Sequence, residues 1–162
     1  MNRRTPLAPA TGLMAALALT LALALALTGC SSGDGDRSSG QPELSVTGGY
    51  MPRPVSDLGA GFLTITNSGD TADKLTSVTG DISDDITIHK TENQKMMEVT
   101  SFDIPADGRL DLERGGSHLM FMDLKHRPQQ GENVSIELHF EKADPIEVEL
   151  PVKETTYNPA QQ

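Results

Sequence analysis

The sequence is short of cysteine, of aromatic residues and of positive charge. A single Cys among 162 residues excludes an intramolecular disulfide, and there is no Trp and only 4% of aromatic residues. The 13 basic and 23 acidic side chains give a formal net charge of −10. Because a phosphate backbone would repel such a surface, the chain is not expected to bind nucleic acid. The length fits one ordinary domain preceded by targeting material.

The first 29 residues have the layout of a signal peptide. Arg3 and Arg4 form a short positive start, and residues 13–27 consist almost entirely of Leu and Ala. A membrane-spanning helix needs roughly 20 apolar residues, so this run is too short for one. It ends in small residues before Cys30, which resembles a bacterial lipobox. We therefore expect cleavage before Cys30 and lipid attachment to its sulfur, at the extracytoplasmic face of the cell membrane. An ordinary secretory signal with an incidental cysteine is the alternative, and the export route stays open.

Residues 30–42 are predicted to be a lipidated cysteine followed by a flexible tether. Residues 31–42 are rich in Ser, Gly and Asp and would reach roughly 40 Å when extended. Asp34, Asp36 and Ser38 begin like a calcium loop, but Ser39 replaces the required glycine. Removal of residues 1–29 leaves 11 basic and 23 acidic side chains, a charge of −12.

Residues 43–153 read as a series of short strands separated by turns. The clearest is residues 134–140, where Val134, Ile136 and Leu138 alternate with polar residues. Other expected strands lie at 44–50, 62–67, 74–78, 86–89, 96–102, 109–112, 118–124 and 146–152. About nine strands in roughly 110 residues favour an all-β fold, a Greek-key β-sandwich or barrel. Residues 154–162 form a polar tail that we expect to fray.

Common enzyme sites find little support in the sequence. Ser117 and His118 are neighbours, but adjacent residues of a strand point to opposite faces and cannot act as a catalytic pair. No glycine-rich phosphate loop follows a strand and opens a helix. We therefore expect a protein that is not an enzyme.

Histidine and methionine occur together in a pattern that fits a metal site. His118 and Met120 are two apart in an expected strand, so both project from the same face. Twenty-one residues separate Met96 from His118, and six separate His89 from Met96. Two imidazoles and two thioethers would form a soft, uncharged site, and thioether sulfur selects Cu(I) over Zn, Ca or Mg.

The remaining candidates have simpler interpretations. A methionine on a strand is usually core filler, and this interpretation applies to Met97, which we expect to point away from Met96. Met122 shares a face with His118 and is either a spare ligand or packing. His126 and His139 are expected to be surface residues.

The spacing and the surrounding sequence resemble the PCuAC-type periplasmic or extracellular copper chaperones. Their motif is a His, then a Met, then about twenty-one residues, then His-x-Met, which Met96, His118 and Met120 match. Most members have about ten residues between the first His and the first Met, where this chain has six. The resemblance covers residues 59–140 and is carried by 61–67, 104–106, 115–122, 124–125 and 131–134.

The resemblance implies a cupredoxin-like β-barrel that binds Cu(I) on an exposed surface through His89, Met96, His118 and Met120. It also implies delivery of copper to the Cu-A site of cytochrome c oxidase subunit II, beside thioredoxin-like Sco proteins. We expect a monomer attached to the membrane through its lipid anchor. The alternatives are an immunoglobulin-like adhesion or assembly module without metal, and a copper-sequestering protein that confers tolerance.

Overall fold

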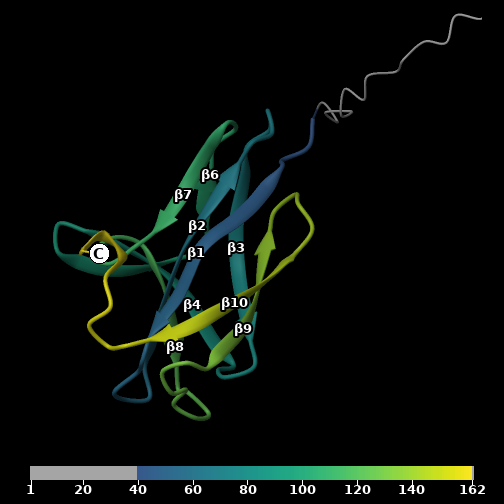
Figure 1. Cartoon of the computed structure of the whole chain (residues 1–162). Coiled ribbons are helices and arrows are strands. Elements are labelled where there is room, and N and C mark those ends of the chain that lie inside the picture. The colour runs from purple at the N-terminus through teal and green to yellow at the C-terminus, as the bar shows by residue number, and fades with distance from the viewer. Residues whose placement is uncertain (1–39, 162) are drawn as a thin grey trace, which may run out of the picture. The chain divides into compact units, whose positions relative to one another are not determined.

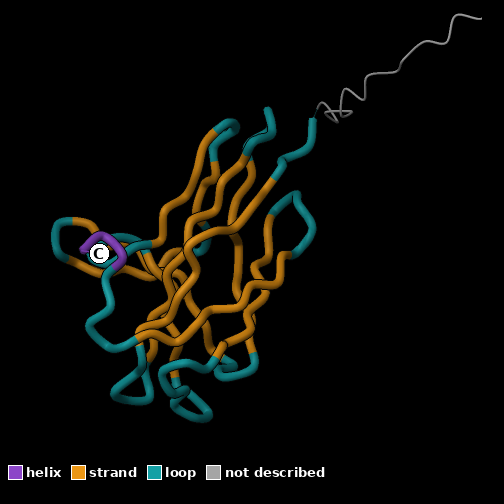
Figure 2. Tube along the Cα trace, in the orientation of Figure 1, coloured by secondary structure: helices purple, strands orange, loops and turns teal. Residues whose placement is uncertain are grey.

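The computed structural model describes residues 40–161, which form an all-β domain of ten strands (Figure 1). The only helical element among them is a short 3-10 helix, η1, near the C-terminus (Figure 2). The strands are β1 (Leu44–Pro52), β2 (Gly59–Asn67), β3 (Asp73–Gly80), β4 (Asp85–Glu92), β5 (Lys95–Val99), β6 (Phe102–Ile104), β7 (Gly108–Leu112), β8 (His118–Met122), β9 (Asn133–Phe140) and β10 (Ile146–Lys153), and η1 is Pro159–Gln161.

The all-β prediction is confirmed, although one expected strand is divided in two and several others differ in their bounds. The run expected at 96–102 is two strands, because the chain leaves β5 at Thr100 and Ser101 and begins β6 with a new partner. The strand expected at 118–124 ends at Met122, and Leu124 is buried in the loop that follows.

The ten strands form one unclosed sheet in the order β5-β4-β8-β2-β1-β10-β9-β3-β6, with β7 beside β2. β2 has three antiparallel partners: β1 pairs along one edge, and on the other edge residues 59–61 pair with β8 and residues 63–67 with β7. The β1–β10 pair is parallel and only two residue pairs long. β3 also contacts β4, and β6 contacts β7, so the sheet curls round a common core.

Alternation along the strands places one apolar face in this core. On β4 and β8, Ile88 is paired with Leu119, and Ile86 with Phe121. Leu119 and Phe121 have no exposed surface, and Ile88 is 4% exposed. Neighbouring residues of these strands therefore project from the opposite, outer face.

Two buried polar side chains fasten the end of the domain where β2 stops. Asn67 is 1% exposed; its Nδ2 donates to the carbonyls of Thr71 and Pro105, and its Oδ1 accepts from the amides of Glu43 and Gly69. These four bonds use the full capacity of a carboxamide. Asp73 is 2% exposed and its carboxylate accepts three backbone amides, from Lys74, Lys142 and Ala143.

The expectation of a frayed tail is wrong for residues 154–161. The Tyr157 ring meets the Tyr50 ring edge-on, with centroids 5.0 Å apart. The Thr155 hydroxyl donates to the Arg53 carbonyl at 3.2 Å, and the Thr155 carbonyl accepts from Arg114. Tyr157 provides the aromatic contact that a purely polar tail would lack.

The signal peptide, Cys30, the start of the tether and the calcium-like Asp34, Asp36 and Ser38 lie outside the described residues. Within residues 40–161, no helix has the length and apolar character needed to cross a membrane.

Candidate metal centre

The four residues expected to bind metal lie on the outer face of three neighbouring strands. β4 is paired with both β5 and β8, and His89 lies directly opposite His118. Met120 is opposite Thr87, and Met96 is opposite Thr91. Because Thr87 and Thr91 are each two residues from His89, all four candidates share one face of the sheet.

Three of the four residues line one hollow. It has a volume of about 360 Å³ and is bordered by Met96, His118 and Met120 together with Ala60, Phe62, Thr91, Arg114 and Gly115. We call it the β8 hollow. His89 is not part of its lining but stacks on His118, with ring centroids 5.7 Å apart and an interplanar angle of 26°.

His118 is held in an orientation that suits a metal ligand. Its side chain is buried, and its Nδ1 lies 3.0 Å from the Gly116 carbonyl oxygen. A carbonyl only accepts, so Nδ1 carries the proton and donates. The lone pair is then on Nε2, which is the arrangement found in metal-binding histidines.

His89 has a buried nitrogen without a partner. Its Nε2 lies 2.9 Å from the Thr87 hydroxyl, whereas Nδ1 is buried and has no hydrogen-bond partner among the described residues. Buried polar atoms are almost always satisfied, so an exception requires an explanation. When Nε2–H donates to Thr87, Nδ1 keeps a lone pair that a metal ion can use.

A tight turn brings Met96 onto this face despite the short spacing. Asn93 and Gln94 form the two-residue turn between β4 and β5, with φ of 50° and 64°. Positive φ at both central residues is typical of a type I′ hairpin turn. The hairpin places Met96 two residues from the position opposite His89, and Met96 is 52% exposed.

Met97 and Met122 are placed outside the β8 hollow. Met97 is opposite Lys90, on the other face of the hairpin from Met96, as expected. Met97 does not belong to the hydrophobic core, because its side chain is 47% exposed. Met122 is on the same face as Met120, opposite Asp85, but does not line the hollow.

The other two histidines lie away from the four candidates. His126 is exposed, as expected. His139, on β9, is half-buried: its Nε2 is 3.0 Å from the Thr79 hydroxyl and 3.3 Å from a Glu137 carboxylate oxygen. It was expected to face solvent, but β3 pairs beside it and supplies Thr79.

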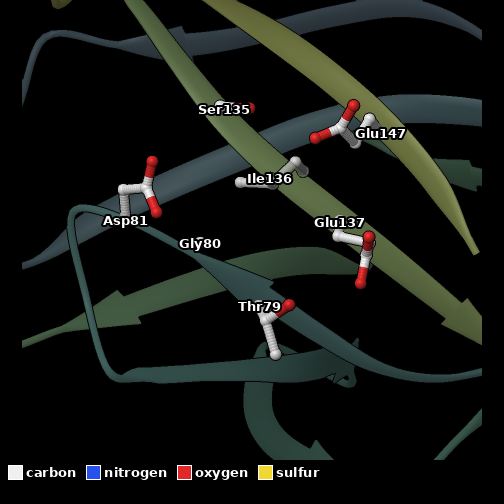
Figure 3. A pocket seen from close by; sticks show the side chains of 7 residues that line it. All are labelled: Thr79, Gly80, Asp81, Ser135, Ile136, Glu137 and Glu147. Carbon is white, nitrogen blue, oxygen red and sulfur yellow. The ribbon is translucent and has the colours of Figure 1, made fainter.

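A second hollow is acidic but does not gather its carboxylates. It has a volume of about 290 Å³, and Asp81, Glu137 and Glu147 are among the residues that line it. Figure 3 shows these three side chains pointing in different directions. Within residues 40–161, no group of three or more His, Cys, Asp or Glu side chains could hold a metal ion.

Phe62 and Arg114 are parts of the site that sequence reasoning missed. The Phe62 ring lies 6.4 Å from the His118 ring, and the Arg114 guanidinium lies 5.8 Å from the Phe62 centroid. Phe62 belonged to an expected strand and to the stretch 61–67 that carries the resemblance, but neither assigned it to the site. Nothing in the sequence indicated Arg114, because its partners belong to β2 and to the tail.

Comparisons with known proteins match the whole domain that carries these residues. The profile of a family described as "Putative lipoprotein LpqE-like" matches residues 44–152. "Putative lipoprotein Lxx21020" from Leifsonia xyli subsp. xyli is 28% identical over 159 residues, which are 95% of this chain and 94% of that protein.

Solved structures of PCuAC domains share the fold. "Copper-bound PCuAC domain from PmoF2" has a TM-score of 0.62 at 19% identity and covers 68% of this chain and 92% of its own. "Solution structure of CuI-DR1885 from Deinococcus Radiodurans" has a TM-score of 0.59 at 26% identity and covers 75% and 87%. The resemblance seen in the sequence, and the cupredoxin-like fold that it implied, are confirmed. The family profile matches most of the domain, and on that match the chain belongs to the LpqE-like family.

Proposed function

We propose that this chain is a copper(I) chaperone that is not an enzyme, with His89, Met96, His118 and Met120 as the copper ligands. The observation that carries the proposal is the placement of all four on one sheet face, three of them around the β8 hollow. The free Nε2 of His118 and the unpartnered Nδ1 of His89 fit a metal ion. The copper named in the titles of two similar structures supports the choice of metal.

The donor set suits a protein that passes copper on. Thioethers and neutral imidazoles carry no charge. A ligand can therefore leave the copper ion without an anion being separated from the cation, as would happen with a thiolate ligand. Met96 is half exposed, whereas His118 is 7% exposed. A partner's ligands can therefore replace Met96 first, while His118 and Met120 still hold the ion.

Copper binding is expected to weaken in acid. A protonated imidazole cannot bind a metal, so protons compete with copper at His89 and His118. The measurement is a competition titration against a Cu(I) chelator between about pH 7 and 5. A constant affinity over this range would contradict ligation by histidine.

We propose that Cys30 carries a lipid that anchors the protein to the membrane, with the domain outside the cytoplasm. We also propose that copper is delivered toward the Cu-A site of cytochrome c oxidase, with a Sco-like protein as a further partner. The names of the family and of the Leifsonia relative support a lipoprotein. Replacement of Cys30 by Ala should abolish the incorporation of labelled fatty acid into the protein. Labelling of this variant equal to that of the original chain would contradict anchoring at Cys30.

The central experiment is X-ray absorption at the copper edge of protein loaded under reducing conditions. We expect both nitrogen and sulfur neighbours, whereas a protein that takes up no copper would favour the metal-free adhesion module. Oxidase activity of a deletion strain, with and without added copper, separates delivery from sequestration. Loss of oxidase activity that added copper restores is the expected result, and unchanged activity would point to sequestration.

A further inference from the structure

Arg114 is the only charged residue among the eight that line the β8 hollow. Its Nη2 donates to the Thr155 carbonyl at 2.8 Å, and its guanidinium lies 5.8 Å from the Phe62 ring centroid. Among residues 40–161, no carboxylate lies within salt-bridge distance of it, whereas four other basic side chains do form salt bridges. Its positive charge at the hollow is therefore not neutralised by an ion pair.

The C-terminal segment and an aromatic stack hold Arg114 in place. Tyr157 packs edge-on against Tyr50, and Tyr50 lies 5.1 Å from Phe62, the ring beneath the guanidinium. Burial raises the pKa of Tyr50, while the nearby charge of Arg114 acts in the opposite direction. The guanidinium thus lies between the Thr155 carbonyl and the Phe62 ring.

Other charged side chains lie near the β8 hollow but do not line it. Glu98, on β5, is opposite His89 on the sheet face of the four candidate ligands, and its carboxylate attracts a cation bound there. Glu113 and Lys153 line an adjacent hollow of about 430 Å³, and their opposite charges offset each other. Arg114 is the charged residue that lines the β8 hollow itself.

We propose that Arg114 is a release residue: its fixed positive charge lowers the affinity of the β8 hollow for Cu(I), and the C-terminal segment holds that charge in position. This inference rests on the proposed function. Four uncharged ligands leave the full charge of the ion in place, so a cation at the rim repels it. Arg114 is not a ligand, and the repulsion makes copper easier to transfer.

The decisive variant is Arg114→Gln, measured by competition with a Cu(I) chelator. Removal of the charge should tighten Cu(I) binding by about 3- to 10-fold. Arg109→Gln is the matched control, because Arg109 lies on β7 and pairs with Asp111 outside the hollow; it should leave the affinity unchanged. A merely structural role for Arg114 predicts weaker binding, so weaker or unchanged binding would overturn the proposal.

Two further variants separate charge from packing. Arg114→Leu keeps an apolar contact with Phe62 and should also tighten binding, whereas Arg114→Lys keeps the charge and should stay close to the original chain. High salt should reduce the difference between Arg114→Gln and the original, because it screens the repulsion. Tightening in Arg114→Lys equal to that in Arg114→Gln would contradict an effect of charge.

Truncation after Glu154 tests the role of the tail. Without the Thr155 carbonyl the guanidinium is no longer held over the hollow, so truncation should tighten Cu(I) binding in the original chain. In the Arg114→Gln background it should have no such effect. Equal effects in both backgrounds would show that the tail does not act through Arg114.

The same titrations distinguish this inference from the proposed function. If the original chain binds no Cu(I), the proposed function fails. If it binds Cu(I) and Arg114→Gln is no tighter, only the role of Arg114 fails.

Discussion

β2 connects two ends of the domain that treat buried polar groups in opposite ways. At one end, the Asn67 side chain makes four hydrogen bonds, so none of its polar atoms is without a partner. At the other end, β2 contributes Ala60 and Phe62 to the β8 hollow, beside which His89 keeps a buried nitrogen without a partner. A satisfied polar side chain stabilises the fold, whereas an unsatisfied one is a place where a ligand can supply the missing interaction. The comparison sets a polar side chain that stabilises the fold, Asn67, against one whose nitrogen has no partner among the described residues, His89.

Replacement of Asn67 by Ala should give the largest effect, and it should be on stability. Two backbone amides and two carbonyls would lose their partner inside the protein, at a cost of about 3 kcal/mol or more in the free energy of unfolding. Urea denaturation measures this cost. Asn133→Ala is the control, because Asn133 is exposed. A cost below about 1 kcal/mol would contradict the assignment of Asn67 as a residue that stabilises the fold.

Replacement of His118 by Ala should act on copper. Loss of an outer partner of a metal ligand typically lowers affinity by about 10- to 100-fold, so loss of the ligand itself should cost at least about 100-fold. A chelator competition titration measures the change. His139→Ala should have no effect, because His139 lies on β9 with Thr79 and Glu137. Equal losses in the two variants would reject the assignment.

Met96→Leu should have a smaller effect, of about 10-fold in Cu(I) affinity, or about 1.4 kcal/mol. Leu keeps the apolar volume and removes the sulfur. Met97→Leu is a closely matched control, since Met97 is 47% exposed on the opposite face of the same strand. If both substitutions lower affinity equally, the face assigned to the ligands is wrong.

Gln94→Gly should have the smallest effect and should be stabilising. Gln94 has φ of 64°, a conformation that costs a non-glycine residue energy. We expect thermal unfolding to show a gain of about 0.5–1 kcal/mol. Asn93→Gly should gain less, because Asn tolerates positive φ better than Gln. A destabilised Gln94→Gly would mean that the hairpin turn differs from the one described.

Much of the fold follows from alternation in the sequence, and less of the site does. The strand at 134–140 and the shared face of His118 and Met120 are consequences of the two-residue period. The break at Thr100 could not be predicted, because β5 and β6 differ in partner rather than in composition. The contact of Arg114 with Thr155 depends on a C-terminal segment that folds back onto the domain, and the local sequence around Arg114 does not indicate this. The position of His89 opposite His118 depends on register between strands far apart in the chain.

In the proposed function, the position of β5 at the end of the strand order gives an acceptor protein an edge from which to approach the copper site. No further strand of the described residues pairs with β5 beyond Met96, so an acceptor can reach this edge without separating two strands. We therefore expect the rate of copper transfer to depend on the contact between the two protein surfaces rather than on opening of the domain.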